Sequence, residues 1–128
     1  EYAFAQKIPY ASIMNQRGEL VEPTAETISA AASGVIPADT RTSITNADAA
    51  GAYPIATFTW MIIYKEQNYS DRSKEQATAT LDLLQYILSD EAQKITSEVH
   101  YAPLPTKAKE LSMKNLKTVT YDGMPILQ

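Results

Sequence analysis

The chain has 128 residues, no cysteine and a formal net charge of −4 at pH 7. This length is typical of one domain with its own core. The lack of cysteine excludes disulfides, zinc–cysteine sites and thiol nucleophiles, and the acidic balance argues against a general nucleic-acid or anionic-membrane surface, which needs a basic patch. No apolar run reaches the roughly 20 residues of a membrane span. Because the chain begins at Glu1 rather than Met, we expect a fragment of a longer protein, with any signal sequence upstream.

The first part of the sequence predicts short elements separated by turns. They are a helix over residues 1–7, strands over 10–14 and 20–21, and a helix over 25–33. Pro9 ends the first helix, and Gly18 supplies the positive φ of the turn between the two strands. Thr24 is a typical N-cap, and Gly34 is the expected left-handed residue after the second helix.

The middle of the sequence predicts a long connection followed by a long strand. Residues 35–51 are polar and irregular, with one short strand near 43–45. Residues 55–65 are rich in β-branched and aromatic side chains, so we expect a strand buried on both faces, with Trp60 inside. Its length of roughly 33–36 Å is about twice the usual value. This segment is therefore either the central strand of a small α/β sandwich or a crossover between two lobes.

Three helices are expected after that strand. The strongest runs over residues 73–88, where Ala77, Leu81, Leu84 and Leu88 repeat at helical spacing; Thr80, Leu83 and Ile87 widen this apolar stripe and predict a largely buried helix. Ser89 begins a second helix that reaches Val99. Residues 101–105 are extended because of their two prolines, Thr106 caps a last helix to Lys117, and Asp122–Gly123 predicts a turn.

No catalytic constellation is visible. His100 is the only histidine, and its position after a helix suits a cation at a helix C-terminus better than a catalytic or metal role. Asp90 and Glu91 are explained as acidic residues in the first turn of a helix. There is no GxGxxG and no P-loop. We therefore predict no enzyme activity, no cofactor and no metal, and we interpret the eight tyrosines as core or interface residues more readily than as a cleft.

Four short segments together resemble a known family. They are residues 1–5, Tyr53-Pro54-Ile55 with Thr57, Thr59 and Tyr64-Lys65, residues 101–105 (Tyr-Ala-Pro-Leu-Pro), and residues 121–126 (Tyr-Asp-Gly-Met-Pro-Ile). In this order and spacing they resemble the C-terminal part of the phosphate-binding protein of bacterial phosphate ABC importers, a periplasmic substrate-binding protein. The resemblance runs over nearly the whole chain.

The resemblance implies an α/β fold that is the C-terminal fragment of a two-lobed periplasmic-binding-protein fold of type II, completing part of each lobe. Residues 1–51 would form the remainder of the second lobe, 52–60 the hinge or crossover strand, and 61–128 the return to the first lobe. The hinge candidates are Tyr53, Pro54, Ile55 and Thr57.

The resemblance also implies inorganic phosphate as the ligand of the full-length protein, an ABC permease as its partner, and a periplasmic or other extracytoplasmic location, with or without a lipid anchor. In that family the phosphate-contacting groups come chiefly from segments upstream of this chain. We therefore assign no ligand contact to any residue here, and we interpret Arg17, Arg41 and Arg72 as solvated loop residues.

Half-lobes without their counterparts would expose apolar surface, so we expect the fragment to self-associate or to pair with its missing half. Two alternatives stay open. One is a structural or interaction module on a related fold with no transport role, and the other is an enzyme on a similar scaffold. Another tetrahedral oxyanion in place of phosphate is equally compatible with the sequence.

Overall fold

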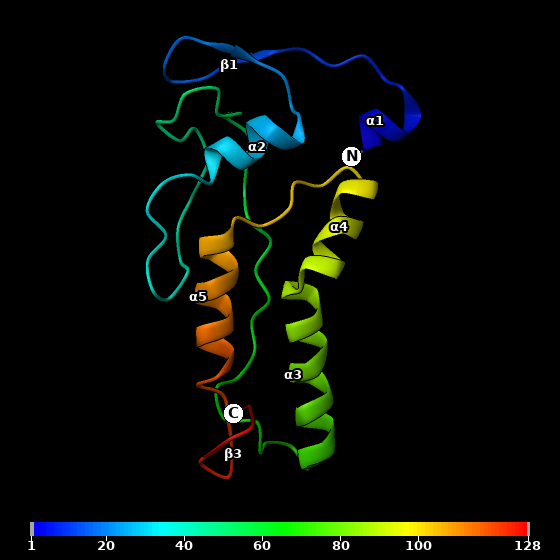
Figure 1. Ribbon diagram of the computed structural model, residues 1–128, viewed down its shortest axis with the longest axis vertical. Helices are drawn as coiled ribbons and strands as arrows, with labels where there is room; N and C mark the ends of the chain where they lie inside the picture. The colour runs from blue at the N-terminus through cyan, green and yellow to red at the C-terminus, as the bar shows by residue number, and fades with distance from the viewer. Residues whose placement is uncertain (1, 128) are drawn as a thin grey trace.

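The computed structural model describes residues 2–127, which form an elongated molecule with small elements at one end and longer helices at the other (Figure 1). In chain order the elements are α1 (Tyr2–Gln6), β1 (Ile13–Met14), β2 (Leu20–Val21), α2 (Ala25–Ala31), α3 (Lys74–Leu88), α4 (Asp90–Glu98), α5 (Thr106–Leu116), β3 (Thr120–Tyr121) and β4 (Met124–Pro125). The predicted start of the first helix at residue 1 lies outside the described residues. Helix and strand are thus mixed, as an α/β chain requires.

The N-terminal hairpin and α2 form as predicted, but β1 covers only the last two residues of the strand expected over 10–14, and α2 ends two residues before the expected 33. Strands β1 and β2 pair antiparallel, with Ile13 opposite Val21, and Gly18 takes a φ of 78° in the turn. Thr24 caps α2 through a capping box with Thr27. The predicted left-handed conformation of Gly34 is wrong. The last turn of α2 closes instead through hydrogen bonds from the Ala32 and Ser33 N–H groups to the Ser29 and Ala30 carbonyls.

A small core lies beside α2. It is built from small side chains and one isoleucine, namely Ala31, Ala32, Ile44, Ala52 and Ala56. Ile28 and Phe58 pack against its edge. The short strand expected near 43–45 is absent from this part of the described chain, and Ile44 instead enters the core from irregular backbone.

Helices α3, α4 and α5 pack together at the other end. Helix α3 begins at a capping box between Ser73 and Gln76, and its Ala77 and Leu81 are fully buried. The stripe is narrower than predicted, because Leu83 is 58% exposed. Ser89 links two helices: its N–H donates to Tyr86 at the end of α3, and its hydroxyl caps α4 by accepting from Ala92.

The N-cap of helix α5 is one residue earlier than predicted. Pro105 holds the N-cap position with an extended backbone and no side-chain bond, and Thr106 is already helical. A buried amide fixes the connector before α5: Gln93 in α4 accepts from the Leu104 N–H at 2.7 Å and donates to the Ile87 carbonyl at 2.9 Å. An ion pair between Lys109 and Asp90 adds a contact between α5 and α4.

The C-terminal hairpin confirms the predicted turn. Strands β3 and β4 pair antiparallel, with Tyr121 opposite Met124. Asp122 and Gly123 both take positive φ, 50° and 74°. Two successive left-handed residues are typical of the tight two-residue hairpin turn, and their twist matches that of the flanking strands.

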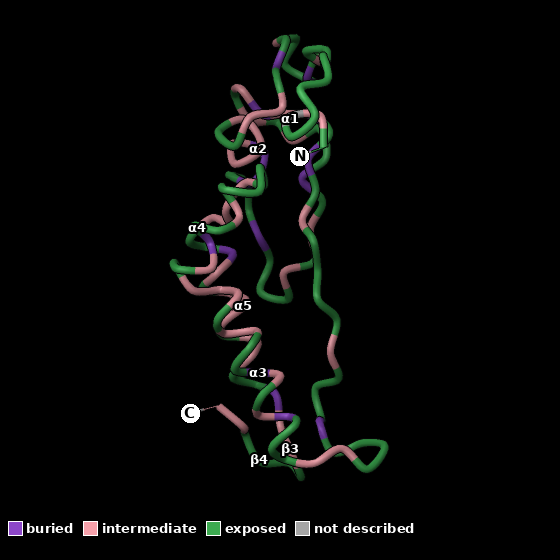
Figure 2. Tube along the Cα trace, turned by 90° about the vertical axis from the view of Figure 1, so that its right-hand side faces the viewer, coloured by how far each residue is buried: buried purple, intermediate pink, exposed green. Residues whose placement is uncertain are grey.

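The predicted long, doubly buried strand over 55–65 is wrong for this chain. Among residues 2–127 the strands form only two two-stranded sheets, and the backbone of residues 57–64 makes no hydrogen bond to another backbone group there. Trp60, expected to be buried, is 45% exposed. Figure 2 shows this segment running mostly exposed along one side of the molecule. The residue types favour a strand, but no strand within residues 2–127 pairs with residues 57–64.

The accessible surface is large for the size of the chain. It measures 8637 Å², whereas a compact monomer of 14.1 kDa exposes roughly 6,700 Å² by the usual scaling with mass. Many large apolar side chains contribute to this excess, among them Ile62 at 94% and Tyr64 at 69% exposure. The described residues therefore do not cover their own apolar surface.

The burial along α3 gives a direct test of its packing. Leu81 is fully buried. The substitution Leu81→Ala should lower the free energy of unfolding by about 2–4 kcal/mol, because it leaves a cavity. Leu83→Ala, on the exposed side of the same helix, should cost under about 1 kcal/mol. Urea denaturation followed by circular dichroism measures both, and equal losses would contradict this orientation of α3.

Candidate functional site

The candidate site is the crossover segment, which we define as residues 52–66. It leaves the core beside α2, runs extended along the molecule and reaches the C-terminal hairpin (Figure 1). Its first half alternates: Ala52, Pro54 and Ala56 are buried, while Ile55 and Thr57 are exposed. This period of two is typical of a β-strand with one covered face. The sequence at the start of the crossover segment is therefore strand-like even where no strand partner is present.

Backbone hydrogen bonds hold that first half against the α2 end. The Tyr53 N–H donates to the Thr27 carbonyl at 2.9 Å, and the Pro54 carbonyl accepts from the Asn46 N–H at 2.8 Å. The Thr45 hydroxyl donates to the Ala56 carbonyl at 3.2 Å. We call these contacts, together with those of Asn15 and Glu19 described next, the first anchor.

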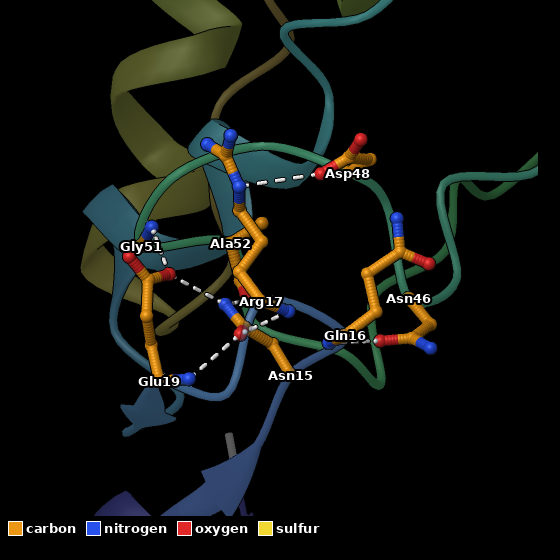
Figure 3. A network of polar contacts seen from close by, with 8 residues as sticks. All are labelled: Asn15, Gln16, Arg17, Glu19, Asn46, Asp48, Gly51 and Ala52. Carbon is orange, nitrogen blue, oxygen red and sulfur yellow. Dashed lines mark hydrogen bonds and ion pairs between the residues drawn. The ribbon is translucent and has the colours of Figure 1, made fainter.

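Asn15 is the central polar residue of the first anchor (Figure 3). It is 5% exposed, and its amide donates to Glu19 at 2.8 Å and to the Ala52 carbonyl at 3.2 Å. Its side-chain oxygen accepts from the N–H groups of Arg17 and Glu19, both at 3.0 Å. A buried amide with all of these bonds made stabilises one arrangement of the turn.

Glu19 joins the hairpin turn directly to the start of the crossover segment. Its carboxylate accepts from the Gly51 N–H at 2.8 Å, where Gly51 takes a φ of 66° that suits glycine. The Asn15 amide, followed by the Gly51 N–H, lowers the pKa of Glu19. Arg17 and Asp48 form an ion pair at 3.3 Å across the same turn. The turn and residues 46–52 thus behave as one hydrogen-bonded unit.

The middle of the crossover segment lacks such contacts. Within the described residues, no backbone N–H or C=O of residues 57–64 bonds to another backbone group. The Trp60 indole N–H donates to the Thr40 carbonyl at 3.3 Å, and its ring meets Phe58 edge-on with centroids 6.0 Å apart. Side chains alone therefore hold this stretch.

Glu66 forms the second anchor, at the far end of the crossover segment. Its carboxylate accepts from the N–H groups of Asn68, Asp122 and Gly123 at 2.9, 3.0 and 3.1 Å, and from the Thr120 hydroxyl at 2.8 Å. These hydrogen bonds, that from Asn68 first, lower the pKa of Glu66 to about 2.

Backbone pairing accompanies the Glu66 carboxylate. Glu66 forms a parallel bridge with Thr120, whose N–H donates to the Lys65 carbonyl and whose carbonyl accepts from the Gln67 N–H, both at 2.8 Å. The crossover segment thus ends as the first step of a parallel strand pair with β3.

The four hinge candidates lie at and just beyond the first anchor. Tyr53 and Pro54 are bonded through their backbones, Ile55 is 66% exposed, and Thr57 is the first residue after the last of these bonds. Asn15, Glu19 and Glu66 were not expected from the sequence. An asparagine at the start of a turn is the one local signal that could have suggested Asn15.

Other side chains considered from the sequence are dispersed. Arg41 is 87% exposed beside Asp39, and His100 follows α4 in a left-handed conformation. Between residues 2 and 127, no three or more His, Cys, Asp and Glu side chains group as metal ligands would. Over the same residues no helix has the length and apolar character needed to span a bilayer.

Comparison of the sequence with known proteins finds relatives that are named as phosphate-binding proteins. The sequence matches no family model. It is 31% identical over 127 residues to the phosphate-binding protein PstS of Methanocaldococcus jannaschii, covering 92% of this chain and 33% of that protein. It is 35% and 34% identical over 107 residues to the PstS proteins of Xylella fastidiosa strains Temecula1 and 9a5c, covering 81% of this chain and 28% of each. The resemblance predicted from the sequence is confirmed, and the chain spans about a third of the length of these relatives.

The second anchor makes an acid-dependent contribution to stability. Because folding lowers the pKa of Glu66 from 4.5 to about 2, its carboxylate stabilises the folded state fully above pH 4.5, and this contribution declines as the pH falls from 4.5 toward 2. Glu66→Gln should therefore destabilise the protein at pH 7, and the difference from the parent should shrink at pH 3. Thermal unfolding at both pH values measures it.

Glu22→Gln is the matched control for Glu66. The Glu22 side chain is exposed and makes no polar contact within the described residues, so the unfolding temperature should change little at either pH. A loss in Glu66→Gln that grew on acidification would contradict the second anchor.

Proposed function

Because this chain is related over most of its own length to the PstS phosphate-binding proteins and spans about a third of theirs, we propose that it is the C-terminal part of a phosphate-binding component of an ABC importer. In this proposal it is an extracytoplasmic, non-enzymatic protein whose partner is an ABC permease. The chain supplies a hinge and a scaffold, and the oxyanion site is formed mainly by residues outside 1–128. The complete protein has the two-lobed fold of type II.

The unpaired backbone of residues 57–64 is the observation that supports this scaffold role most strongly. An extended strand needs partners for its N–H and C=O groups, and burial without partners is costly. The residue types there, including Phe58, Trp60 and Ile62, suit a strand covered by a sheet and its helices. Polypeptide outside residues 1–128 would supply the neighbouring strands and cover the exposed apolar side chains.

We place the hinge in residues 52–60, between a second-lobe part (residues 1–51) and a first-lobe part (residues 61–128). Tyr53 and Pro54 are tied to the α2 end by hydrogen bonds, so they define the fixed side of the hinge together with Ile55. Rotation is easiest from Thr57 onward, where the backbone bonds stop. A hinge of this kind needs a few residues that absorb a change in φ and ψ between packed units.

Phosphate binding is the direct test of the proposed function. By isothermal titration calorimetry, residues 1–128 alone should bind phosphate at least about a hundredfold more weakly than the complete protein, because the ligand contacts come from outside this chain. Titration of the complete protein with sulfate is the control for oxyanion selectivity. Equal phosphate affinity of the fragment and the complete protein would contradict the scaffold role.

The association state of the fragment is a separate test. Residues 1–128 leave apolar side chains exposed along the crossover segment, so we expect them to form dimers or larger species, or to bind the separately expressed remainder of the protein. Sedimentation equilibrium measures the mass. A stable monomer of 14.1 kDa that does not bind the remainder would contradict the expected pairing.

A further inference from the structure

Arg72 is a partly buried arginine that has no acidic partner between residues 2 and 127. The sequence suggested a solvated loop residue; Arg72 does lie in the loop before α3, but it is only partly exposed. Its guanidinium lies over the start of α3 and donates to the Tyr69 hydroxyl at 2.9 Å, to the Gln76 carbonyl at 3.1 Å and to the Thr80 hydroxyl. All three acceptors are neutral. Within the described residues no carboxylate lies within ion-pair distance of it.

The position of Arg72 is well determined by its neighbours. Its N–H donates to the Tyr69 carbonyl at 3.0 Å, and its carbonyl accepts from the Tyr121 hydroxyl at 2.9 Å. The guanidinium lies 5.6 Å from the centre of the Tyr69 ring, as in a cation–π contact. Tyr69 in turn packs edge-on against Tyr64 of the crossover segment. Arg72 is thus held in place before any further partner binds.

The guanidinium has unused donor capacity. An arginine side chain carries five N–H donors, and three of them are used by the contacts above. The Nε–H is buried and has no acceptor in the described residues. A buried donor without a partner is costly, and a buried cation is normally paired with an anion. An acceptor with negative charge beside the exposed terminal nitrogens of Arg72 would pair this cation, while the Nε–H stays covered by the described residues.

The surroundings of Arg72 favour one carboxylate over a polyanion. An open depression of about 430 Å³ lies beside it, lined by Arg72, Gln76, Ala79 and Thr80. A phosphate group would need several more donors, but the Gln76 N–H is already bound to the Ser73 hydroxyl. Glu75 uses its own N–H and the Ser73 hydroxyl, which lower its pKa. The guanidinium is the only charged group that lines this depression.

We propose that Arg72 receives an aspartate or glutamate side chain from polypeptide of the same protein outside residues 1–128, which packs over the first turns of α3. This inference rests on the proposed function, since it requires that the complete protein is about three times the length of this chain. The area beside Arg72 is then an internal interface that residues 1–128 leave open.

Chemical crosslinking of the complete protein tests the contact. In Arg72→Lys a primary amine replaces the guanidinium, and a carbodiimide joins that amine to a carboxylate in contact with it. Mass spectrometry should find the crosslink between position 72 and an Asp or Glu outside residues 1–128. The parent protein, whose guanidinium does not couple, and Arg41→Lys, in the exposed loop, are controls. A crosslink only to Asp71, Glu75 or another carboxylate within residues 1–128, or no crosslink at position 72, would overturn the inference.

A second variant covers the case in which Arg72→Lys changes the local fold. Arg72→Gln keeps hydrogen-bonding capacity without charge, and it should weaken binding between residues 1–128 and the separately expressed remainder about two- to fivefold at low salt, with a smaller effect at 1 M salt. Arg41→Gln should leave this affinity unchanged. An effect of Arg72→Gln that does not depend on salt would argue against a charge pair. If the complete protein binds phosphate but position 72 forms no such crosslink, this inference is wrong and the proposed function is unaffected.

Discussion

An extended polypeptide has N–H and C=O groups along both of its edges, and in residues 57–64 those groups have no backbone partner within the described chain. The rest of the structure is arranged around that stretch. The small α2 core holds its beginning, β3 holds its end, and the three longer helices lie to one side of it (Figures 1 and 2). Because unpaired backbone is tolerated only in water, burying this segment requires strands from elsewhere.

Both ends of the crossover segment use the same chemistry. Glu19 at one end and Glu66 at the other accept hydrogen bonds from backbone N–H groups, Gly51 for the first and Asn68, Asp122 and Gly123 for the second. A carboxylate can accept several such bonds at once, so a single side chain can fix a turn and a strand together. The result is a connection with well-defined ends and a middle that adapts to what packs against it.

Local patterns in the sequence predicted local structure well. The caps at Thr24 and Ser89 and the Asp122–Gly123 turn depend on bonds within a few residues, and all are confirmed. The strand over 55–65 was wrong for this chain because strand formation depends on a partner. The same limit explains why the burial of Trp60 was wrong.

The candidate site was harder to predict than the elements. The segment around Tyr53 and Pro54 was recognised from its resemblance to a family, and its hinge role remains a proposal. Asn15, Glu19 and Glu66 contact residues 32 to 57 positions away in the chain. No periodicity or motif in a single sequence reports such contacts, since they depend on the tertiary arrangement of two hairpins.

Ser89 is both the C-cap of α3 and the N-cap of α4, so no other residue separates the two helices. Fraying at the end of α3 removes the bond to Tyr86 and at the same time disturbs the cap of α4. Amide protons on either side of this residue should therefore exchange with solvent in one cooperative opening.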